Sequence, residues 1–213
     1  MAFQCSFSAV EAILAGMNFI ADPHRSAFAS RIKNIQRLKF PSGINTGRGV
    51  AAIYRAEHVL LLGLTIELLQ LGLTPERAVR TLSNNSRTIM QAFCDELLAE
   101  SQEAKGYDFT GPRQTFLGFD PEAMQELAKQ PEGLETVEDI ASFTFIYGGV
   151  DTLTHWLQNP FPNQGIRLAV IPLTRFMQRL LSHVSHSLGS DQHNEFALAL
   201  AEWAASGLQD RPL

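Results

Sequence analysis

Residues 24–56 carry the strongest signal in this chain, and they read HRSAFASRIKNIQRLKFPSGINTGRGVAAIYRA. The first half predicts a helix that begins at Asp22-Pro23, because Asp is a favoured N-cap and Pro suits the first helical position. Apolar residues at helical spacing give this helix one face for the core: Phe28, Ile32, Ile35 and Leu38. Polar and basic residues recur on the opposite face: Ser26, Ser30, Lys33 and Arg37. The segment therefore predicts a helix with a buried inner face and a basic outer face.

The charge of the chain is divided unevenly. The 213 residues carry a formal net charge of −5. Residues 1–90 hold ten Lys or Arg against five Asp or Glu, whereas residues 91–213 hold seven against seventeen. Residues 24–56 contain no acidic residue, and their basic residues are Arg25, Arg31, Lys33, Arg37, Lys39, Arg48 and Arg55. Such a division indicates that the first part meets a polyanion, with a solvated basic face that has no partner as the alternative.

A glycine-rich loop follows the basic helix. Pro41 is expected to end the helix, because the residue before a proline is pushed out of the helical conformation. Residues 41–52 then contain three glycines around Arg48. A loop of this kind can follow an unusual backbone path and bring the arginine close to another surface.

Three further helices are expected between this loop and residue 106. Residues 57–71 are rich in leucine and leave little polar surface, so this helix is predicted to be central. The next helix starts at Thr74-Pro75, which supplies an N-cap and a proline at the first position. The last starts at Ser86 and carries a wide apolar stripe: Ile89, Met90, Phe93, Cys94, Leu97 and Leu98.

The pattern changes after residue 106. Strand-like runs cover residues 113–118, 142–148 and 167–171. Helical patterns lie between and after them, at residues 121–129, 151–158, 173–188 and 192–205. This alternation predicts a small mixed α/β (α+β) domain behind a mainly α-helical N-terminal part.

Two stretches of the chain resemble the DNA-binding domain of the MerR family of transcription regulators. Residues 32–41, IKNIQRLKFP, are similar to the second helix of that family's helix-turn-helix and the proline that follows it. Residues 54–59, YRAEHV, and residues 72–78, GLTPERA, resemble the end of the wing and the two helices after it. The resemblance is confined to residues 8–85.

The resemblance implies a winged helix-turn-helix that binds double-stranded DNA as a homodimer and regulates transcription. It divides the chain into a DNA-binding domain over residues 1–85, a dimerisation or linker helix over 86–106, and an acidic sensor or protein-interaction domain over 107–213. The candidate DNA contacts are Ser26, Ser30, Lys33, Asn34, Arg37, Arg48, Tyr54 and Arg55. The candidate dimer contacts are Ile89, Met90, Phe93 and Leu97.

Other classes of function have weaker support. The sequence contains no P-loop, no nucleotide-binding glycine motif, no Gly-x-Ser-x-Gly and no zinc-protease helix, so we expect no enzymatic activity and no cofactor. His183 and His186 lie three residues apart near Asp191 and His193, a spacing that could hold a metal. A polar helix end is the favoured interpretation, and we predict no metal site.

The location and the partners are also expectations. No apolar run reaches the roughly 20 residues of a membrane span, and the N-terminus lacks the pattern of a signal peptide. Cys5 and Cys94 are interpreted as reduced thiols of a cytoplasmic protein. The competing hypothesis is an adaptor that uses a MerR-like module to bind an acidic protein surface rather than DNA. A small-molecule effector or a protein partner of the C-terminal domain is left open.

Overall fold

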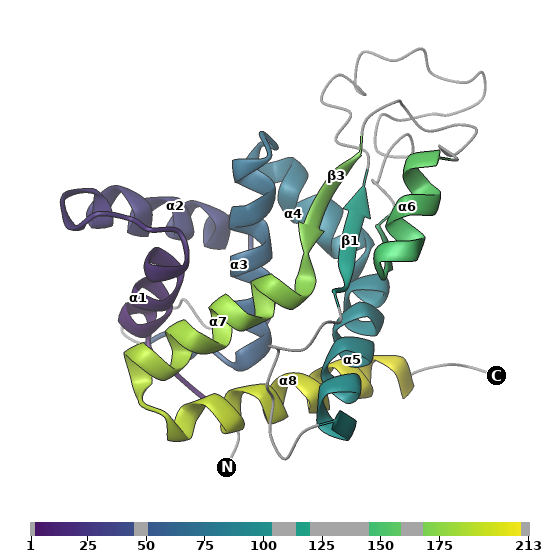
Figure 1. Ribbon diagram of the computed structural model, residues 1–213. Helices are drawn as coiled ribbons and strands as arrows, with labels where there is room; N and C mark the ends of the chain where they lie inside the picture. Colours follow the sequence, from purple (N-terminus) through teal and green to yellow (C-terminus); the bar gives the residue numbers. More distant parts are fainter. Residues whose placement is uncertain (1–2, 45–50, 104–113, 120–144, 159–167, 210–213) are drawn as a thin grey trace.

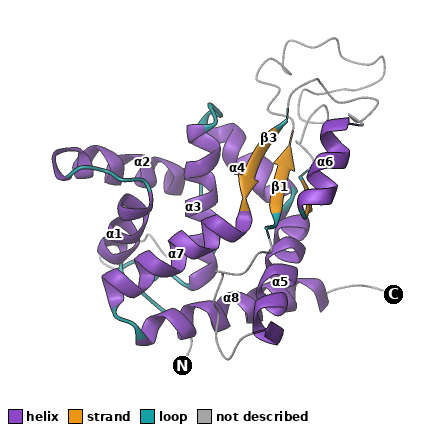
Figure 2. Ribbon diagram, in the orientation of Figure 1, coloured by secondary structure: helices purple, strands orange, loops and turns teal. Residues whose placement is uncertain are grey.

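The computed structural model describes residues 3–44, 51–103, 114–119, 145–158 and 168–209 (Figure 1). Helices dominate these residues, and the strands form one small antiparallel sheet (Figure 2). The helices are α1 Phe7–Met17, η1 Asp22–His24, α2 Arg25–Arg37, α3 Ala56–Gln70, α4 Pro75–Asn84, α5 Ser86–Glu103, α6 Val150–Gln158, α7 Leu173–Leu188 and α8 Asp191–Gln209. The strands are β1 Phe116–Phe119, β2 Ile146–Gly148 and β3 Ala169–Pro172. The prediction of a mainly helical chain with a smaller mixed part is confirmed at this level.

Helices α1 and α2 lie at one side of the molecule, and α2 runs across α1 rather than alongside it (Figure 1). The backbone N–H of Ala9 donates to the Ser6 hydroxyl, which caps α1 at 3.3 Å. The predicted start of the basic helix at Asp22-Pro23 is one turn early, because Asp22–His24 form a 3₁₀ turn before α2. Two residues after the end of α2, the backbone of Lys39 adopts a left-handed conformation with φ of 60°.

Helix α3 runs through the centre of the fold, as its leucine-rich sequence predicts. Its buried residues cover almost the whole circumference: Ala56, His58, Val59, Leu60, Leu62, Gly63, Leu64, Thr65, Ile66 and Leu68. Helix α4 starts after Thr74, whose hydroxyl accepts a hydrogen bond from the N–H of Arg77 at 3.4 Å. The predicted starts of α4 at Thr74-Pro75 and of α5 at Ser86 are confirmed.

The sheet has β1 in its middle, with β2 and β3 antiparallel on either side. Leu117 of β1 lies opposite Tyr147 of β2 and Ile171 of β3. The three predicted strand regions are confirmed with shorter bounds. The helix predicted over residues 121–129 lies outside the described residues.

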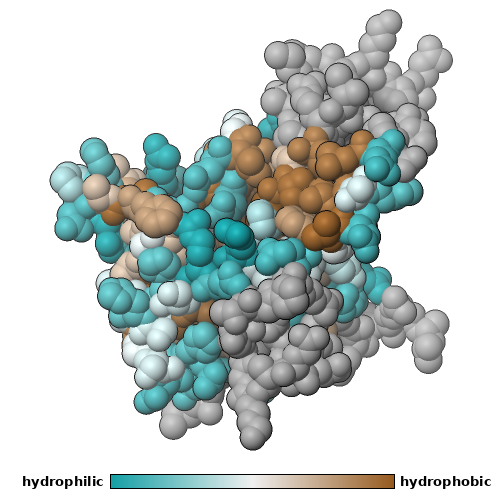
Figure 3. All heavy atoms as spheres, viewed as in Figure 1, coloured by the Kyte–Doolittle hydropathy of each residue, from teal (hydrophilic) through white to brown (hydrophobic). Residues whose placement is uncertain are grey.

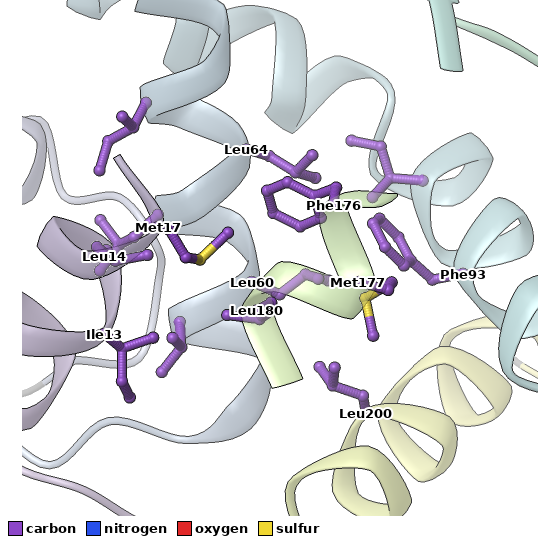
Figure 4. Packing of buried hydrophobic residues seen from close by; sticks show 14 of the residues in the cluster. Ile13, Leu14, Met17, Leu60, Leu64, Phe93, Phe176, Met177, Leu180 and Leu200 are labelled. Carbon is purple, nitrogen blue, oxygen red and sulfur yellow. The ribbon is translucent and has the colours of Figure 1, made fainter. Parts of the chain in front are cut away.

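The last two helices pack against the first half of the chain. Helix α7 contacts α1, and α8 contacts α3 and α5. Figure 4 shows side chains of all five helices in one cluster: Ile13, Leu14, Met17, Leu60, Leu64, Phe93, Phe176, Met177, Leu180 and Leu200. The helices before and after the domain boundary predicted between residues 106 and 107 therefore share one hydrophobic core.

Buried polar contacts fix the sheet to the helices. The Thr174 hydroxyl donates to Glu96 Oε1 of α5 at 2.7 Å and accepts from the N–H of Thr115 at 2.9 Å. The N–H of Phe145 donates to Asn85 Oδ1, between α4 and α5, at 2.9 Å. Because a buried polar group without a partner is costly, these bonds set the position of the sheet on α5.

A close approach between α1 and α7 offers a test of this packing. A Cβ atom added at Gly16 would lie 2.5 Å from His183 Nδ1. We expect Gly16→Ala to lower the free energy of unfolding by about 1–3 kcal/mol, because the imidazole has to move within a packed interface. In a His183→Ala chain the same change is expected to stabilise by about 0.5–1 kcal/mol, since alanine favours a helix over glycine. Urea unfolding of the four proteins measures both effects, and equal effects in the two chains would contradict the contact.

Nowhere in the described residues does a helix combine the length and the apolar character that crossing a membrane requires.

Candidate nucleic-acid interface

Helix α2 is anchored by one face and open on the other. Phe28, Ile32 and Ile35 are buried on its inner face, where the helix contacts α1 and α4. The side chains of its outer face are exposed: Ser26, Ser30, Arg31, Lys33, Asn34 and Arg37. The helix lies at the margin of the molecule (Figure 1). We call these six residues the α2 outer face.

Short-range contacts order the α2 outer face. Arg37 Nη1 donates to Asn34 Oδ1 at 2.9 Å. The Ser30 hydroxyl donates to the carbonyl of Ser26 at 3.0 Å. Lys33 Nζ lies 5.3 Å from the centre of the Phe7 ring, within the range of a cation–π contact. The structure therefore brings together on one surface five of the residues predicted to contact DNA.

The cations of this region differ in whether they are paired. Arg25 forms a bidentate ion pair with Glu11, with N···O distances of 2.6 and 2.7 Å, and this hydrogen-bonded partner raises the pKa of Arg25. Glu57 lies 3.9 Å from both Arg55 and His58. The α2 outer face carries the cations Arg31, Lys33 and Arg37, and Lys39 follows just after the helix. Within the described part of the chain, no carboxylate forms an ion pair with any of these four.

Arg31 and Lys39 were not among the predicted contacts. Arg31 belongs to the α2 outer face, and Lys39 is exposed just after the helix ends. Both lie in the acid-free segment of residues 24–56, so the charge pattern already contained the signal that identifies them.

The prediction that Tyr54 contacts DNA is wrong. Its side chain is 1% exposed, and its hydroxyl accepts a hydrogen bond from the Gln36 amide. Its backbone pairs with that of Cys5 through two hydrogen bonds of 2.9 Å. Burial raises the pKa of the Tyr54 phenol. Tyr54 thus holds α2 from the inside, because Gln36 belongs to that helix.

The two remaining predicted contacts have different outcomes. Arg48, with the rest of residues 45–50, lies outside the described residues, and so does the centre of the predicted wing. Arg55 is exposed just before α3, with Nη1 3.9 Å from a carboxylate oxygen of Glu57.

The predicted dimer seam on α5 is also wrong. Ile89, Phe93 and Leu97 are at most 1% exposed, and Met90 is half-buried. Helix α5 packs against α8 of the same chain, which covers this stripe. A second copy of the chain therefore has no access to it in the folded monomer.

A cavity of about 530 Å³ opens beside the end of α2. Residues 38–43, the start of α3, the facing ends of α4 and α5, and Trp203 of α8 form its walls. His58 lines it and is 5% exposed, and its Nδ1 accepts a hydrogen bond from the N–H of Arg55 at 3.1 Å. Burial lowers the pKa of His58 more than the nearby Glu57 carboxylate raises it.

His58 is expected to make the fold less stable in mild acid. With a folded pKa below the ordinary value of 6.5, the unfolded chain binds more protons than the folded one between those two values. The contribution of His58 to stability is therefore complete above pH 6.5 and decreases as the pH falls below it. Urea unfolding at pH 7.5 and 5.5 should show a smaller pH effect for His58→Gln than for the unchanged chain. The exposed His24→Gln serves as the control, and equal pH effects in His58→Gln and the unchanged chain would contradict this role.

The two histidines of α7 differ in exposure, because His183 is half-buried and His186 is exposed. His183 faces Gly16 of α1, and burial lowers its pKa. Among the described residues, no group of three or more His, Cys, Asp or Glu side chains is placed to hold a metal ion.

No protein-family model, no curated protein and no solved structure matches this chain.

Proposed function

We propose that this chain is a DNA-binding transcription regulator that inserts the α2 outer face into the major groove. The observation that carries the proposal is a single exposed helix face that holds three cations and no acid, on a helix whose other face is fixed in the core. A B-DNA major groove admits one α-helix, and Lys and Arg contacts to phosphates supply much of the affinity. Helix α1, which α2 crosses, would act as the positioning helix of a helix-turn-helix.

The side chains divide into two roles under this proposal. Lys33, Arg31 and Lys39 bind phosphates, because each is an exposed cation without a carboxylate partner in the described structure. Arg37 and Asn34 read base edges, since arginine pairs with guanine and asparagine with adenine in the major groove. Their mutual hydrogen bond orients both groups before DNA arrives.

A homodimer remains part of the proposal, with an interface other than the α5 stripe. One helix face offers few phosphate contacts, and two-fold symmetry doubles them on a palindromic site. Arg48 is proposed to contact the DNA backbone from the loop that resembles the family's wing.

Selection from a random duplex library tests the proposal and identifies the target sequence at the same time. We expect enrichment of one sequence, with tighter binding of that duplex than of a scrambled one in fluorescence anisotropy. Four phosphate contacts per chain would contribute about −3.6 to the log–log salt slope for each bound chain, so even a single chain would bind roughly 150-fold more weakly at 200 mM than at 50 mM salt. If no sequence is enriched and the slope is near zero, the proposal fails, and the adaptor hypothesis takes its place.

A further inference from the structure

The cavity beside α2 has walls from parts of the chain far apart in sequence. Phe40 and Pro41 come from the segment after α2, and Trp203 comes from α8 near the other end of the chain. Its volume of about 530 Å³ lies within the range of roughly 300–1,000 Å³ that small-molecule sites occupy.

The walls combine an apolar lining with two cations. The apolar side chains come from every element around the cavity, among them Phe40, Leu61, Leu82, Met90 and Trp203. Lys39 and Arg55 both line the cavity and are exposed, so their charged groups can reach a molecule inside it. Glu57 supplies one negative charge beside Arg55. With His58 neutral because burial lowers its pKa, the local charge stays positive.

A second hydrophobic area lies apart from this cavity. Figure 3 shows it over the sheet and α6. Helix α6 carries two exposed apolar side chains, Val150 and Leu157, which are 55% and 67% exposed. Neither residue lines the cavity beside α2, so this area serves as a control surface for apolar binding.

We propose that this cavity binds a small aromatic or branched apolar anion, a carboxylate, sulfonate or phosphate ester. The apolar body lies against Trp203 and Met90, and the anionic group lies between Lys39 and Arg55. The aromatic wall and the two cations together specify this ligand class, because they line the same cavity. Neither feature alone would specify it.

Two dyes that differ only by the anionic group test the proposal on the full chain. The first is 8-anilinonaphthalene-1-sulfonate, and the second is N-phenyl-1-naphthylamine, which has the same rings without the sulfonate. Fluorescence titration should give one site per chain, with about fivefold tighter binding of the sulfonate than of the neutral dye. Equal affinities of the two dyes would overturn the assignment of an anion site.

Four variants locate the site. Lys39→Ala with Arg55→Ala should abolish the preference for the sulfonate and leave the neutral dye unchanged; both residues are exposed, so the fold is kept. Trp203→Ala should weaken both dyes about tenfold, and Trp203→Phe should restore most of that loss. Leu157→Ser, on the control surface, should change neither. A sulfonate preference that survives the double change, or dye binding lost only in Leu157→Ser, would place binding elsewhere and overturn the proposal.

Occupancy of the cavity is expected to weaken DNA binding, a consequence that rests on the proposed function. The anion engages Lys39 and Arg55 and lies against the segment that continues α2. Saturating 8-anilinonaphthalene-1-sulfonate should reduce DNA affinity in the unchanged chain. Lys39→Ala/Arg55→Ala binds DNA more weakly without dye, because Lys39 is a proposed phosphate contact, and the dye should cause no further reduction. Unchanged DNA affinity would refute this coupling. Failure to bind DNA without dye would refute the proposed function and leave the dye titrations as the separate test of the cavity.

Discussion

Replacement of Phe196 by alanine is expected to lower the free energy of unfolding by about 3–5 kcal/mol. Phe196 lies on α8 with 0% of its surface exposed, and its ring packs edge-to-face on Phe3 with a centroid distance of 4.8 Å. The two residues join the beginning and the end of the chain. Alanine would leave a cavity between them that the neighbouring helices cannot fill completely.

The matched control is Leu198→Ala on the same helix. Leu198 is 53% exposed, so its loss should change the free energy of unfolding by no more than about 0.5 kcal/mol. Urea unfolding followed by circular dichroism measures both variants. Hydrogen exchange then shows whether α3 is affected together with α8, as the shared core requires. If Phe196→Ala loosens only α8 while α3 keeps its protection, the two halves of the chain are independent domains.

Local patterns predicted most helices of this fold. The leucine-rich run of α3, the Thr74-Pro75 start of α4 and the periodic pattern of α7 each depend on neighbours within a few residues. Caps and periodicity are read from such neighbours, so the sequence alone contains the information. The exposed face of α2 was predictable for the same reason, because one helix fixes which residues share a side.

Long-range partners were not predictable in this way. The α5 stripe at Ile89 and Phe93 has the pattern of a dimer seam and of an internal interface alike, and only the path of α8 decides between them. Tyr54 follows a basic, glycine-rich loop, and the sequence around it is typical of a segment that contacts DNA. Its burial depends on Cys5 and Gln36, which lie far from it in sequence. In both cases the partner that covers the side chain lies far from it in sequence.

The largest expected effect on function comes from the α2 outer face. Changing Arg31, Lys33 and Arg37 together to alanine is expected to weaken binding of the selected duplex by at least about a hundredfold. The three side chains are exposed and form no ion pairs within the described residues, so the fold should change by less than about 1 kcal/mol. Arg175→Ala, an exposed cation on α7, is the control and should bind DNA normally.

The single changes separate the two kinds of contact on that face. Lys33→Ala should weaken all duplexes alike and reduce the salt slope by about one for each bound chain, because each chain loses a phosphate contact. Arg37→Ala should cost about 1–3 kcal/mol with the selected duplex and much less with a scrambled one, because a base contact is lost. Circular dichroism confirms that each variant is folded before anisotropy is measured. A folded triple variant that binds the selected duplex at full strength would exclude α2 as the DNA-reading element, since no cation would remain on its outer face.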